Sequence, residues 1–445
     1  MYDDSCGQPI QQFESARSGP GEIETHMQRT FTDVACTVCG CVCDDLQVDV
    51  ADDCITQARG VCALSEPWFA SLSQPSRRPA ATVDGKPTAF DEAVQHAVEI
   101  LRGSKSPLVW GLARGSTAGH RAAVALAEQI GGTVDTVTST KPEAAMAFQK
   151  LGQSTCTLGE VRNRADLVVF WRANPVVTHP RHLERYSVEP PGLFVPRGKA
   201  DRTIVVVDVA STETSERADT FLKIASVDET VVVESLKRLV RGEEASETTL
   251  SSELLSQLKR LAQQLKDCKY GALFLGGANS QARGDATEAL FMLTRELNAF
   301  TRFTVHVLGR PTGAENVLTW QTGFPFAVNF ALGYPRFDPQ AFSANVLLER
   351  GEVDSCVLVG SDSVQLLSPA ATDRLQQLPT IALDYPYADP GFAATVSFTT
   401  AIYGIHAAGT AYRMDGVSIP LRKILSAEYP TDEEVLNGIA SQLKA

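Results

Sequence analysis

Short continuous apolar runs, several of them followed by an amphipathic helical pattern, constrain the fold of this chain more than any other feature. The run "PLVWGLA" precedes "AGHRAAVALAEQIGG", and "ADLVVFWRANP", "RTIVVVDVAS", "YGALFLGG" and "DSCVLVGSD" follow. Strands without apolar/polar alternation suit parallel sheets that helices cover on both faces. We therefore predict an α/β fold of doubly wound sheets, whose ligands bind in loops at the carboxyl ends of the strands.

The composition is that of an ordinary globular protein, with 445 residues, 44% of them hydrophobic and 21% charged. The net charge of -13 argues against nucleic acid as a partner. No run of about 18 apolar residues occurs, so we expect no membrane span. The beginning of the chain lacks the apolar core of a signal peptide, and we expect a disordered leader over residues 1–29 of a cytoplasmic protein.

Six of the ten cysteines crowd between positions 36 and 62. Cysteines of a cytoplasmic protein are normally reduced, which sets a disulfide knot aside. The pattern Cys36-x2-Cys39-x3-Cys43, followed by Cys62, supplies four thiolates with three on one tight loop, as a [4Fe–4S] cluster requires. Zinc, which prefers two separated C-x2-C pairs, and unligated reduced cysteines are the alternatives. Cys41 lies between two predicted ligands, and we expect its side chain to point elsewhere.

A second group of polar residues follows the apolar run "DLVVFW". Asn174 and Pro175 end that strand and His179 lies in the next loop, where Asn, Arg and backbone amides can hold phosphate or pyrophosphate. Asp208 closes the following run, where an acidic residue commonly meets a hydroxyl or amino group of a nucleotide-like ligand. An ordinary helix start, in which Asn, His and Arg merely cap and pair, is the alternative.

The segment "NVLTWQTGFPFAVNFALGYPRFDP" is aromatic and proline-rich, without clean periodicity. A stretch of this length in a compact domain indicates a functional or partner surface, and packed core is the equal alternative. The sequence contains no Ser-His-Asp arrangement, P-loop or H-E-x-x-H pattern, so hydrolysis by those routes has no support.

Together these blocks resemble the B subunit of formylmethanofuran dehydrogenase. The resemblance also rests on "ACTVCGCVCDDLQV", "RGVCALSEPWF" and "GIHAAGTAYRMDGVSIPLRKIL", and it covers about residues 30 to 430. That family is similar to molybdopterin-dependent formate dehydrogenases. The resemblance implies a small N-terminal iron–sulfur domain followed by two doubly wound α/β domains, as in molybdopterin oxidoreductases. We expect a cysteine-rich domain at 30–78, a discontinuous α/β domain at 86–105 and 265–430, an inserted α/β domain at 106–264, and a tail at 431–445.

The resemblance also implies two cofactors. One is a [4Fe–4S] cluster, and the other is tungsten- or molybdenum-bis(pterin guanine dinucleotide). The implied cluster ligands are Cys36, Cys39, Cys43 and Cys62, and the implied pterin contacts are Asn174, Pro175, His179 and Asp208.

One departure from the family concerns the metal ligand. The catalytic enzymes carry a metal-ligating cysteine or selenocysteine after an "IDT"-like strand, whereas this chain reads "VDTVTSTKPEAAMAFQ". Ser139, Thr140 and Lys141 fall where the ligand would be, and Cys156 lies too far along to replace it. A hydroxyl oxygen is a poorer ligand for these metals than a thiolate. A second departure is "WRANP", where the archaeal form tends to read "WGCNP".

We therefore expect the B subunit of a formyltransferase/hydrolase complex of one-carbon metabolism, with a degenerate metal–pterin site and no catalytic residue of its own. By resemblance, such a complex transfers formyl groups to a methanofuran analogue and releases formate. Hydrolysis belongs to the amidohydrolase-like A subunit, and the A, C and D subunits are the partners. The alternatives are the B subunit of a working tungsten or molybdenum formylmethanofuran dehydrogenase and a cofactor-free structural subunit.

Overall fold

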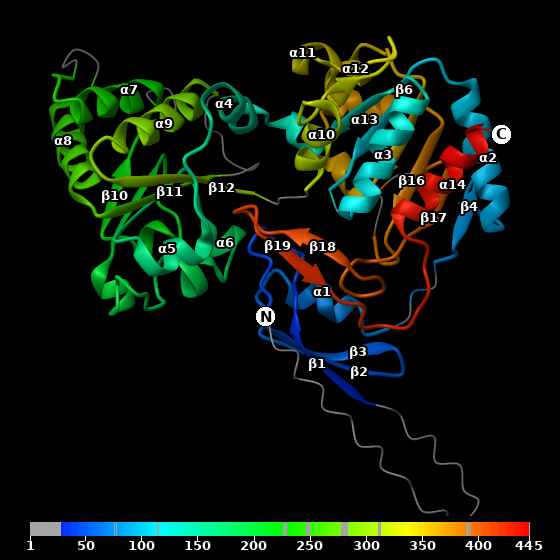
Figure 1. Ribbon diagram of the computed structural model, residues 1–445, viewed down its shortest axis with the longest axis horizontal. Coiled ribbons are helices and arrows are strands. Elements are labelled where there is room, and N and C mark those ends of the chain that lie inside the picture. The colour runs from blue at the N-terminus through cyan, green and yellow to red at the C-terminus, as the bar shows by residue number, and fades with distance from the viewer. Residues whose placement is uncertain are drawn as a thin grey trace, which may run out of the picture.

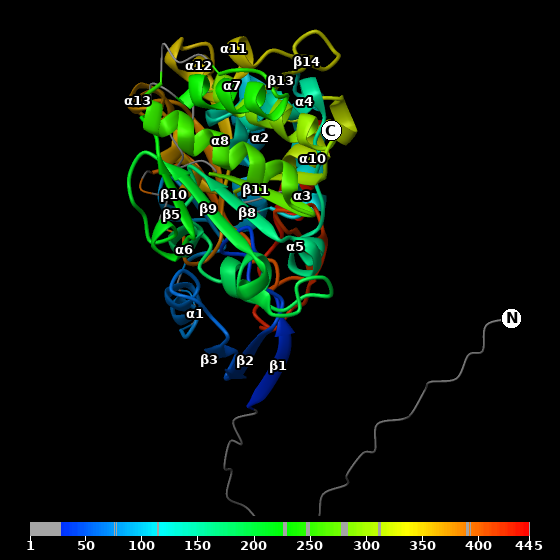
Figure 2. The ribbon, with the colours of Figure 1, turned by 90° about the vertical axis from the view of Figure 1, so that its left-hand side faces the viewer.

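The structure is a computed structural model that describes residues 28–74, 76, 78–113, 115–225, 229–245, 250–276, 284–309, 313–388, 391 and 393–444. Two large sheets lie side by side, and a small cysteine-containing segment lies at one end of the molecule in both views (Figures 1 and 2). None of the helices in these ranges is long and apolar enough to cross a membrane. The predicted leader falls outside these ranges except for its last two residues, and the first strand already begins at Arg29.

The cysteine-containing segment is a three-stranded antiparallel sheet with one short helix. Its elements are β1 (Arg29–Val34), β2 (Leu46–Ala51), β3 (Cys54–Arg59) and α1 (Glu66–Ser71). Alternating residues of β2 and β3, among them Val48, Val50 and Ile55, are buried in a core shared with the neighbouring five-stranded sheet. The loop between β1 and β2 carries most of the clustered cysteines.

The five-stranded sheet is entirely parallel, as the apolar runs predict. In spatial order its strands are β10 (Thr220–Lys223), β9 (Thr203–Asp208), β8 (Leu167–Trp171), β11 (Tyr270–Gly276) and β12 (Arg302–Leu308). Both faces are buried, since Phe170 belongs to one core and Trp171 to another. The surrounding helices are α4 (Glu143–Leu151), α5 (Leu158–Arg164), α6 (Pro175–Thr178), α7 (Glu229–Val240), α8 (Ser252–Asp267) and α9 (Gly284–Leu297).

The nine-stranded sheet has five parallel strands in its centre and antiparallel strands at its edges. In spatial order these are β14 (Arg336–Phe337), β13 (Val328–Asn329), β7 (Thr133–Thr136), β6 (Pro107–Gly111), β15 (Ser355–Val359), β16 (Thr380–Asp384), β17 (Val396–Thr399), β4 (Ala81–Val83) and β5 (Lys86–Pro87). Its helices are α2 (Phe90–Gly103), α3 (Thr117–Gln129), α10 (Ala314–Thr322), α11 (Pro339–Phe342), α12 (Ala344–Glu349), α13 (Pro369–Leu375) and α14 (Asp432–Lys444). A hairpin of β18 (Gly409–Tyr412) and β19 (Ser418–Leu421) lies toward the cysteine segment (Figure 1).

Sheet membership corrects the predicted domain boundaries. β6 and β7, placed by sequence in the insert 106–264, belong to the nine-stranded sheet, whereas β11 and β12 belong to the five-stranded sheet rather than to 265–430. The chain therefore changes sheets between β7 and β8 and again between β12 and β13. Apolar parallel strands satisfy their backbone hydrogen bonds equally well in either sheet, so the runs themselves do not encode which sheet they join.

The predicted C-terminal tail is instead a core element. In α14 the side chains of Val435, Leu436 and Ile439 are fully buried, in a core shared with α2 and α3. Figure 1 shows α14 beside these two helices. The helical spacing of these apolar residues, four and three apart, places them on one face of the helix.

Candidate functional site

The loop between β1 and β2 folds back on itself and gathers thiols. The Cys36 amide donates to the Cys43 carbonyl oxygen at 2.8 Å, and the Val42 amide donates to the Cys39 carbonyl oxygen at 3.2 Å. The pKa of the Cys36 thiol is raised to about 12, first by burial and also by the other three predicted ligands, which lie close to it. The structure thus brings the four predicted ligands into one neighbourhood.

Cys62 reaches this neighbourhood from the turn that precedes α1. Its amide donates to the Ser65 Oγ at 2.9 Å, and its carbonyl oxygen accepts from the Ser65 amide at 2.9 Å. Its Sγ lies 3.5 Å from the same hydroxyl. This turn fixes the position of the fourth thiol with respect to the helix that follows.

The expectation that the Cys41 side chain points away is wrong. Cys41 is fully buried, and hydrogen bonds with Cys39 and Cys43 raise the pKa of its thiol well above the usual value. The backbone turns at Gly40–Val42, with a left-handed φ of 39° at Val42, which spacing along the sequence does not reveal. Five thiols therefore gather where four were expected.

Two arginines of the segment after β8 bind the acidic pair that follows the cysteines. The Arg181 guanidinium contacts both Asp45 carboxylate oxygens at 2.8 Å, and Arg185 Nη2 contacts Asp44 Oδ1 at 2.8 Å. The pKa of the Cys43 thiol is lowered, first by its hydrogen bond with Cys41 and also by these two arginines. Sequence reasoning missed this contact. The sequence does contain a pattern that could have indicated it: two arginines four residues apart in "RHLER" and two adjacent aspartates after the cysteines.

The donor chemistry of the loop suits a soft, thiolate-ligated group, and the two arginines offset its negative charge. Within the ranges that the structure describes, however, no group of three or more His, Cys, Asp or Glu side chains is arranged to hold a metal ion. The ligand assignment of Cys36, Cys39, Cys43 and Cys62 therefore stays a prediction.

The four residues expected to contact a nucleotide lie together at the carboxyl edge of β8 and β9. The Asn174 amide nitrogen donates to Glu213 Oε2 at 2.7 Å, while its oxygen accepts from the Thr214 hydroxyl at 2.7 Å. Imidazole Nε2 of His179 lies 3.2 Å from the Gly309 carbonyl oxygen. Pro175 is buried at the first position of α6. Each of these polar groups already has a partner within the chain.

The fourth residue, Asp208, pairs with a buried arginine that sequence reasoning missed. Arg172 Nη1 lies 3.0 Å from Asp208 Oδ1, and Arg172 Nε lies 3.8 Å from Glu229 Oε2. The indole nitrogen of Trp171 donates to the other Glu229 oxygen at 2.8 Å. Arg172 has a left-handed φ of 51° and only 5% of its side chain is exposed. A cation thus occupies the edge where a ligand contact was predicted.

The turn after β7, where the resemblance implies a metal-ligating thiolate, carries hydroxyl groups that are already engaged. Ser139 Oγ lies 2.5 Å from Asp135 Oδ2, and the Thr140 hydroxyl donates to the Val137 carbonyl oxygen at 2.8 Å. Lys141 is exposed. Burial raises the pKa of the Asp135 carboxyl to about 6. Asp135 also accepts the Ala327 and Ala344 amides at 2.9 and 2.7 Å, so it anchors the segment between them.

The aromatic segment 316–339, predicted as either a functional or partner surface or packed core, is partly buried and partly exposed. The aromatic rings of Phe324 and Phe337 stack at 5.0 Å, and Phe326 is fully buried. In contrast, the Trp320 side chain on α10 is 90% exposed and Tyr334 is 56% exposed. The buried part contributes to the core, and the exposed part is an apolar surface of the kind that marks interaction sites.

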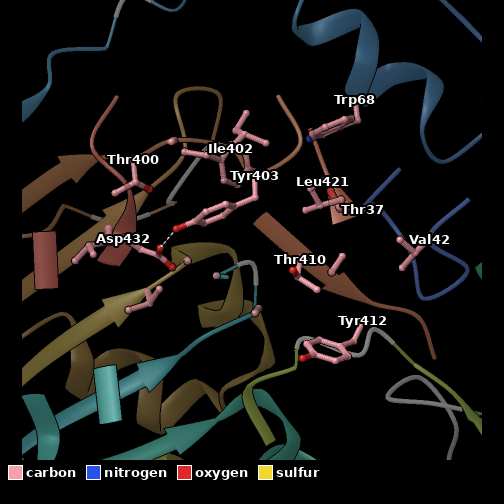
Figure 3. Close-up of a pocket in the computed structure, with 18 of the residues that line it drawn as sticks. Thr37, Val42, Trp68, Thr400, Ile402, Tyr403, Thr410, Tyr412, Leu421 and Asp432 are labelled. Atoms are coloured by element: carbon pink, nitrogen blue, oxygen red, sulfur yellow. Dashed lines mark hydrogen bonds between the residues drawn. The ribbon is translucent and has the colours of Figure 1, made fainter. Parts of the chain in front are cut away.

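A cavity of about 100 Å³ lies between the cysteine loop and the carboxyl edge of the nine-stranded sheet (Figure 3). Thr37 and Cys39 line it from the loop, and Trp68 from α1. Tyr403 extends toward Asp432 and donates its hydroxyl proton to that carboxylate (Figure 3). Burial raises the pKa of the Asp432 carboxyl to about 6. The described lining includes no Lys, Arg or His. Its C-terminal part comes from "GIHAAGTAYR", which sequence reasoning did not assign to a site.

No family model matches the chain. It is 32% identical to the B subunit of tungsten-containing formylmethanofuran dehydrogenase 2 from Methanocaldococcus jannaschii, over 94% of this chain and 99% of the relative. The same protein from Methanococcus maripaludis is 31% identical, over 89% of this chain and 94% of the relative. The chain belongs to the family of formylmethanofuran dehydrogenase B subunits. The resemblance stated from the sequence is thereby confirmed.

One more curated protein and two solved structures extend the comparison. The B subunit of the Fhc formyltransferase/hydrolase complex from Methylorubrum extorquens is 25% identical, over 63% of this chain and 75% of the relative. The crystal structure of that complex, FhcABCD with methylofuran, matches with a TM-score of 0.68 and 24% identity, over 82% of this chain and 99% of the other. Acetylene hydratase from Pelobacter acetylenicus matches with a TM-score of 0.65 and 12% identity, over 93% and 69%. The predicted mixed α/β fold with large sheets is confirmed.

Proposed function

We propose that this chain is the B subunit of a formyltransferase/hydrolase complex of one-carbon metabolism, whose own metal–pterin site is degenerate. The observation that carries the proposal is the turn after β7. At the position implied for a metal-ligating thiolate, the chain offers the Ser139 hydroxyl, which is bound to Asp135 and to the Thr136 carbonyl oxygen. A neutral hydroxyl engaged in this way is a poor ligand for tungsten or molybdenum.

The residues expected to contact a pterin nucleotide support the same conclusion. Asp208, which would accept a hydrogen bond from the nucleotide, is bound to Arg172, and Asn174 is bound to Glu213 and Thr214. The cavity beside the cysteine loop measures about 100 Å³. Ligand sites for drug-sized molecules occupy about 300–1,000 Å³. These residues and this cavity do not fit a bis(pterin guanine dinucleotide).

The cysteine loop fits its predicted cofactor better. Cys36, Cys39, Cys43 and Cys62 would hold a [4Fe–4S] cluster, which would supply one-electron transfer and a covalent brace for the segment between β1 and α1. Cys36 and Cys43 are buried, Cys39 and Cys62 are half-buried, and the nearby guanidinium groups offset part of the charge that four thiolates would carry. Cys41, the fifth thiol, would lie beside the cluster as a neighbour.

In this proposal the complex transfers formyl groups to a methanofuran analogue and releases formate, and an amidohydrolase-like A subunit carries out the hydrolysis. The A, C and D subunits are its partners, and its location is cytoplasmic. The FhcABCD complex with methylofuran has a chain of the same fold, which supports the assembly part of the proposal. The exposed Trp320 and Tyr334 side chains supply apolar surface for a partner.

Metal analysis together with activity assays tests this function. Purified anaerobically, the complex is expected to release formate from the formylated methanofuran analogue, to contain neither tungsten nor molybdenum, and to reduce no viologen dye with formate. Stoichiometric tungsten or molybdenum together with viologen-linked formate oxidation would overturn the proposal.

A second function has one observation in its favour. The relatives with the higher identity, 32% and 31% over most of the chain, are tungsten-containing dehydrogenase subunits. The B subunit of a working tungsten or molybdenum formylmethanofuran dehydrogenase is therefore the second candidate. It predicts the opposite result in the same metal and viologen assays.

A further inference from the structure

The amino-terminal edge of the five-stranded sheet bears a hollow that no predicted site residue lines. Its volume is about 370 Å³. Four cationic side chains from separate segments line it: Arg164, Arg197, Lys269 and Arg302. On a chain with a net charge of -13, four cationic side chains in one hollow indicate a binding site for an anion.

The topology of the sheet explains why these side chains converge. Lys269 immediately precedes β11, Arg302 begins β12, and Arg302 is the register partner of Tyr270. Because the strands are parallel, their amino ends meet at one edge. The carboxyl edge, with Asn174 and Asp208, lies about 20 Å away along a seven-residue strand. The hollow is therefore separate from the candidate site.

The acids in the lining are used for structure. Asp166 accepts the Tyr270 amide at 2.9 Å and the Lys269 amide at 3.0 Å. Asp201 accepts the Arg197 Nε at 2.6 Å. Asp201 and Arg197 offset each other's charge, and the Asp166 contacts hold the Lys269 backbone in place.

The cations are less fully compensated. Arg164 contacts Glu160 at 3.1 Å, and its guanidinium lies over the Phe194 ring, 4.6 Å from the centroid. Across the part of the chain that the structure describes, the side chains of Lys269 and Arg302 have no hydrogen bond or ion pair, and both are exposed. Of the four cations, Arg164 and Arg197 are therefore paired with carboxylates, whereas Lys269 and Arg302 have no carboxylate partner among the described residues.

We propose that this hollow binds a polyphosphate group of the pyrophosphate type. Guanidinium groups bind phosphate oxygens through paired N–H donors, and a lysine adds a mobile point charge. A hollow of this size accommodates a small dianion or trianion, for which Lys269 and Arg302 are the two cations without an ion pair in the described part of the chain. This site goes beyond the proposed function, since it requires neither the cysteine loop nor the formyl-transfer chemistry.

Calorimetric titration of inorganic pyrophosphate into the purified complex tests the site. The double variant Lys269→Gln/Arg302→Gln is expected to weaken binding at least about tenfold, because each removes a charge-assisted contact. Because both side chains are exposed and neither has a hydrogen bond or ion pair in the described part of the chain, the variant is expected to fold. The matched control is Lys259→Gln, an exposed lysine of α8 outside the hollow, and it is expected to bind like the wild type.

Further ligands identify the source of the polyphosphate. Tighter binding of ATP than of pyrophosphate supports the site and assigns a nucleotide, and equal binding supports it and assigns the bare diphosphate. Citrate binding as tightly as pyrophosphate overturns the phosphate assignment. Absence of pyrophosphate binding, or equal binding by the wild type and the double variant, overturns the site itself. Formate release is measured in parallel, so a complex that binds pyrophosphate but releases no formate contradicts the proposed function alone.

Discussion

Arg172 Nη1 lies 3.0 Å from Asp208 Oδ1, and this ion pair is almost completely buried at the carboxyl edge of the five-stranded sheet. Glu229, whose carboxylate has no exposure, lies on the other side of the guanidinium. One cation therefore sits between two buried carboxylates, at the place where the sequence predicts contact with a ligand. Removing a buried cation from such a group leaves uncompensated charge, which costs more than the pair itself contributes.

We predict that Arg172→Gly lowers the free energy of unfolding by about 3–5 kcal/mol, the usual cost of breaking a buried ion pair. The measurement is urea unfolding followed by circular dichroism. The control is Arg238→Ala, which replaces a half-exposed arginine of α7 and should change stability little. Alanine is used there because a glycine would weaken the helix. An Arg172→Gly protein as stable as the wild type would show that Asp208 and Glu229 find other partners.

The contact between Arg181 and Asp45 is expected to hold the cysteine loop against the five-stranded sheet. Arg181→Ala removes a bidentate pair in which the Asp45 carboxylate is 42% exposed, so we expect a loss of at most about 1 kcal/mol. We expect a larger effect on the local opening of the cysteine loop than on the free energy of unfolding of the whole protein. Hydrogen exchange of the loop between β1 and β2 should accelerate, while exchange in β8 and β11 stays unchanged. Unchanged exchange in the loop would mean that the cluster thiols alone fix it.

The cysteine ligands are tested by serine substitution in the anaerobic complex. Cys39→Ser is expected to remove the iron–sulfur absorbance and to destabilise the segment from β1 to α1, because a cluster braces its loop. Cys41→Ser should retain the absorbance, since Cys41 is outside the predicted ligand set although it points inward. Cys268→Ser, in the turn after α8, is the control. Loss of absorbance in Cys41→Ser but not in Cys39→Ser would reassign the ligands.

Glycine positions at the α3–α14 contact give a pair of opposite predictions. A Cβ on Gly119 would lie 2.1 Å from Asp432 Oδ2, whereas a Cβ on Gly438 would meet nothing within 4 Å. Gly438→Ala should stabilise the protein by about 0.5–1 kcal/mol, because alanine favours the helix. Gly119→Ala, also in a helix, should destabilise it, because the buried Asp432 side chain or α14 itself must shift. Thermal unfolding compares the two, and equal shifts in Tm would refute the close packing.

Stability is predicted to fall as pH rises through the range in which Asp135 titrates. Its pKa is raised from 3.8 to about 6, so the folded state binds more protons than the unfolded state between these values. The free energy of unfolding therefore decreases from about pH 4 to pH 6, by up to about 3 kcal/mol for this one group. The pKa of Asp432 is also raised to about 6, so its titration lowers the free energy of unfolding over the same pH range.

The variant Asp135→Asn tests this dependence. Unfolding in urea at a series of pH values should give a flatter profile for the variant than for the wild type, apart from the remaining contribution of Asp432. The variant is also less stable near pH 5, because one amide oxygen cannot accept all the bonds that the two carboxylate oxygens of Asp135 accept. Asp373→Asn, on an exposed position of α13, should reproduce the wild-type profile. An unchanged slope in Asp135→Asn would contradict the raised pKa.

The sequence predicts those parts of the structure that depend on local patterns. The runs containing Trp110, Phe170 and Val206 are strands because unbroken apolar segments suit sheets buried on both faces. Asn174 and Asp208 lie at the same edge of the sheet because they respectively follow and end two neighbouring parallel strands. The formation of these strands and the position of these two residues at a carboxyl edge do not depend on which sheet each strand joins.

Other features depend on contacts between distant segments. Arg172 has a left-handed backbone conformation, and its buried guanidinium lies near Glu229 on α7. Cys41 turns inward because the loop reverses at Gly40–Val42. Likewise Asp432 packs against Gly119 across two helices. Residue spacing carries no signal for these contacts, and neither does composition.

The pairing of β6 with β15 has a consequence for synthesis of the chain on the ribosome. Trp110 and Leu358 are register partners, and all of the five-stranded sheet is made between them. β6 can pair with β7 early, but its other edge, which pairs with β15, must wait without a partner until most of the protein has been translated. The five-stranded sheet can form during this interval. Nascent chains paused before residue 355 are thus expected to expose one edge of β6 and to depend on chaperones. Chains paused before residue 300 lack β12 as well, so their five-stranded sheet is also incomplete.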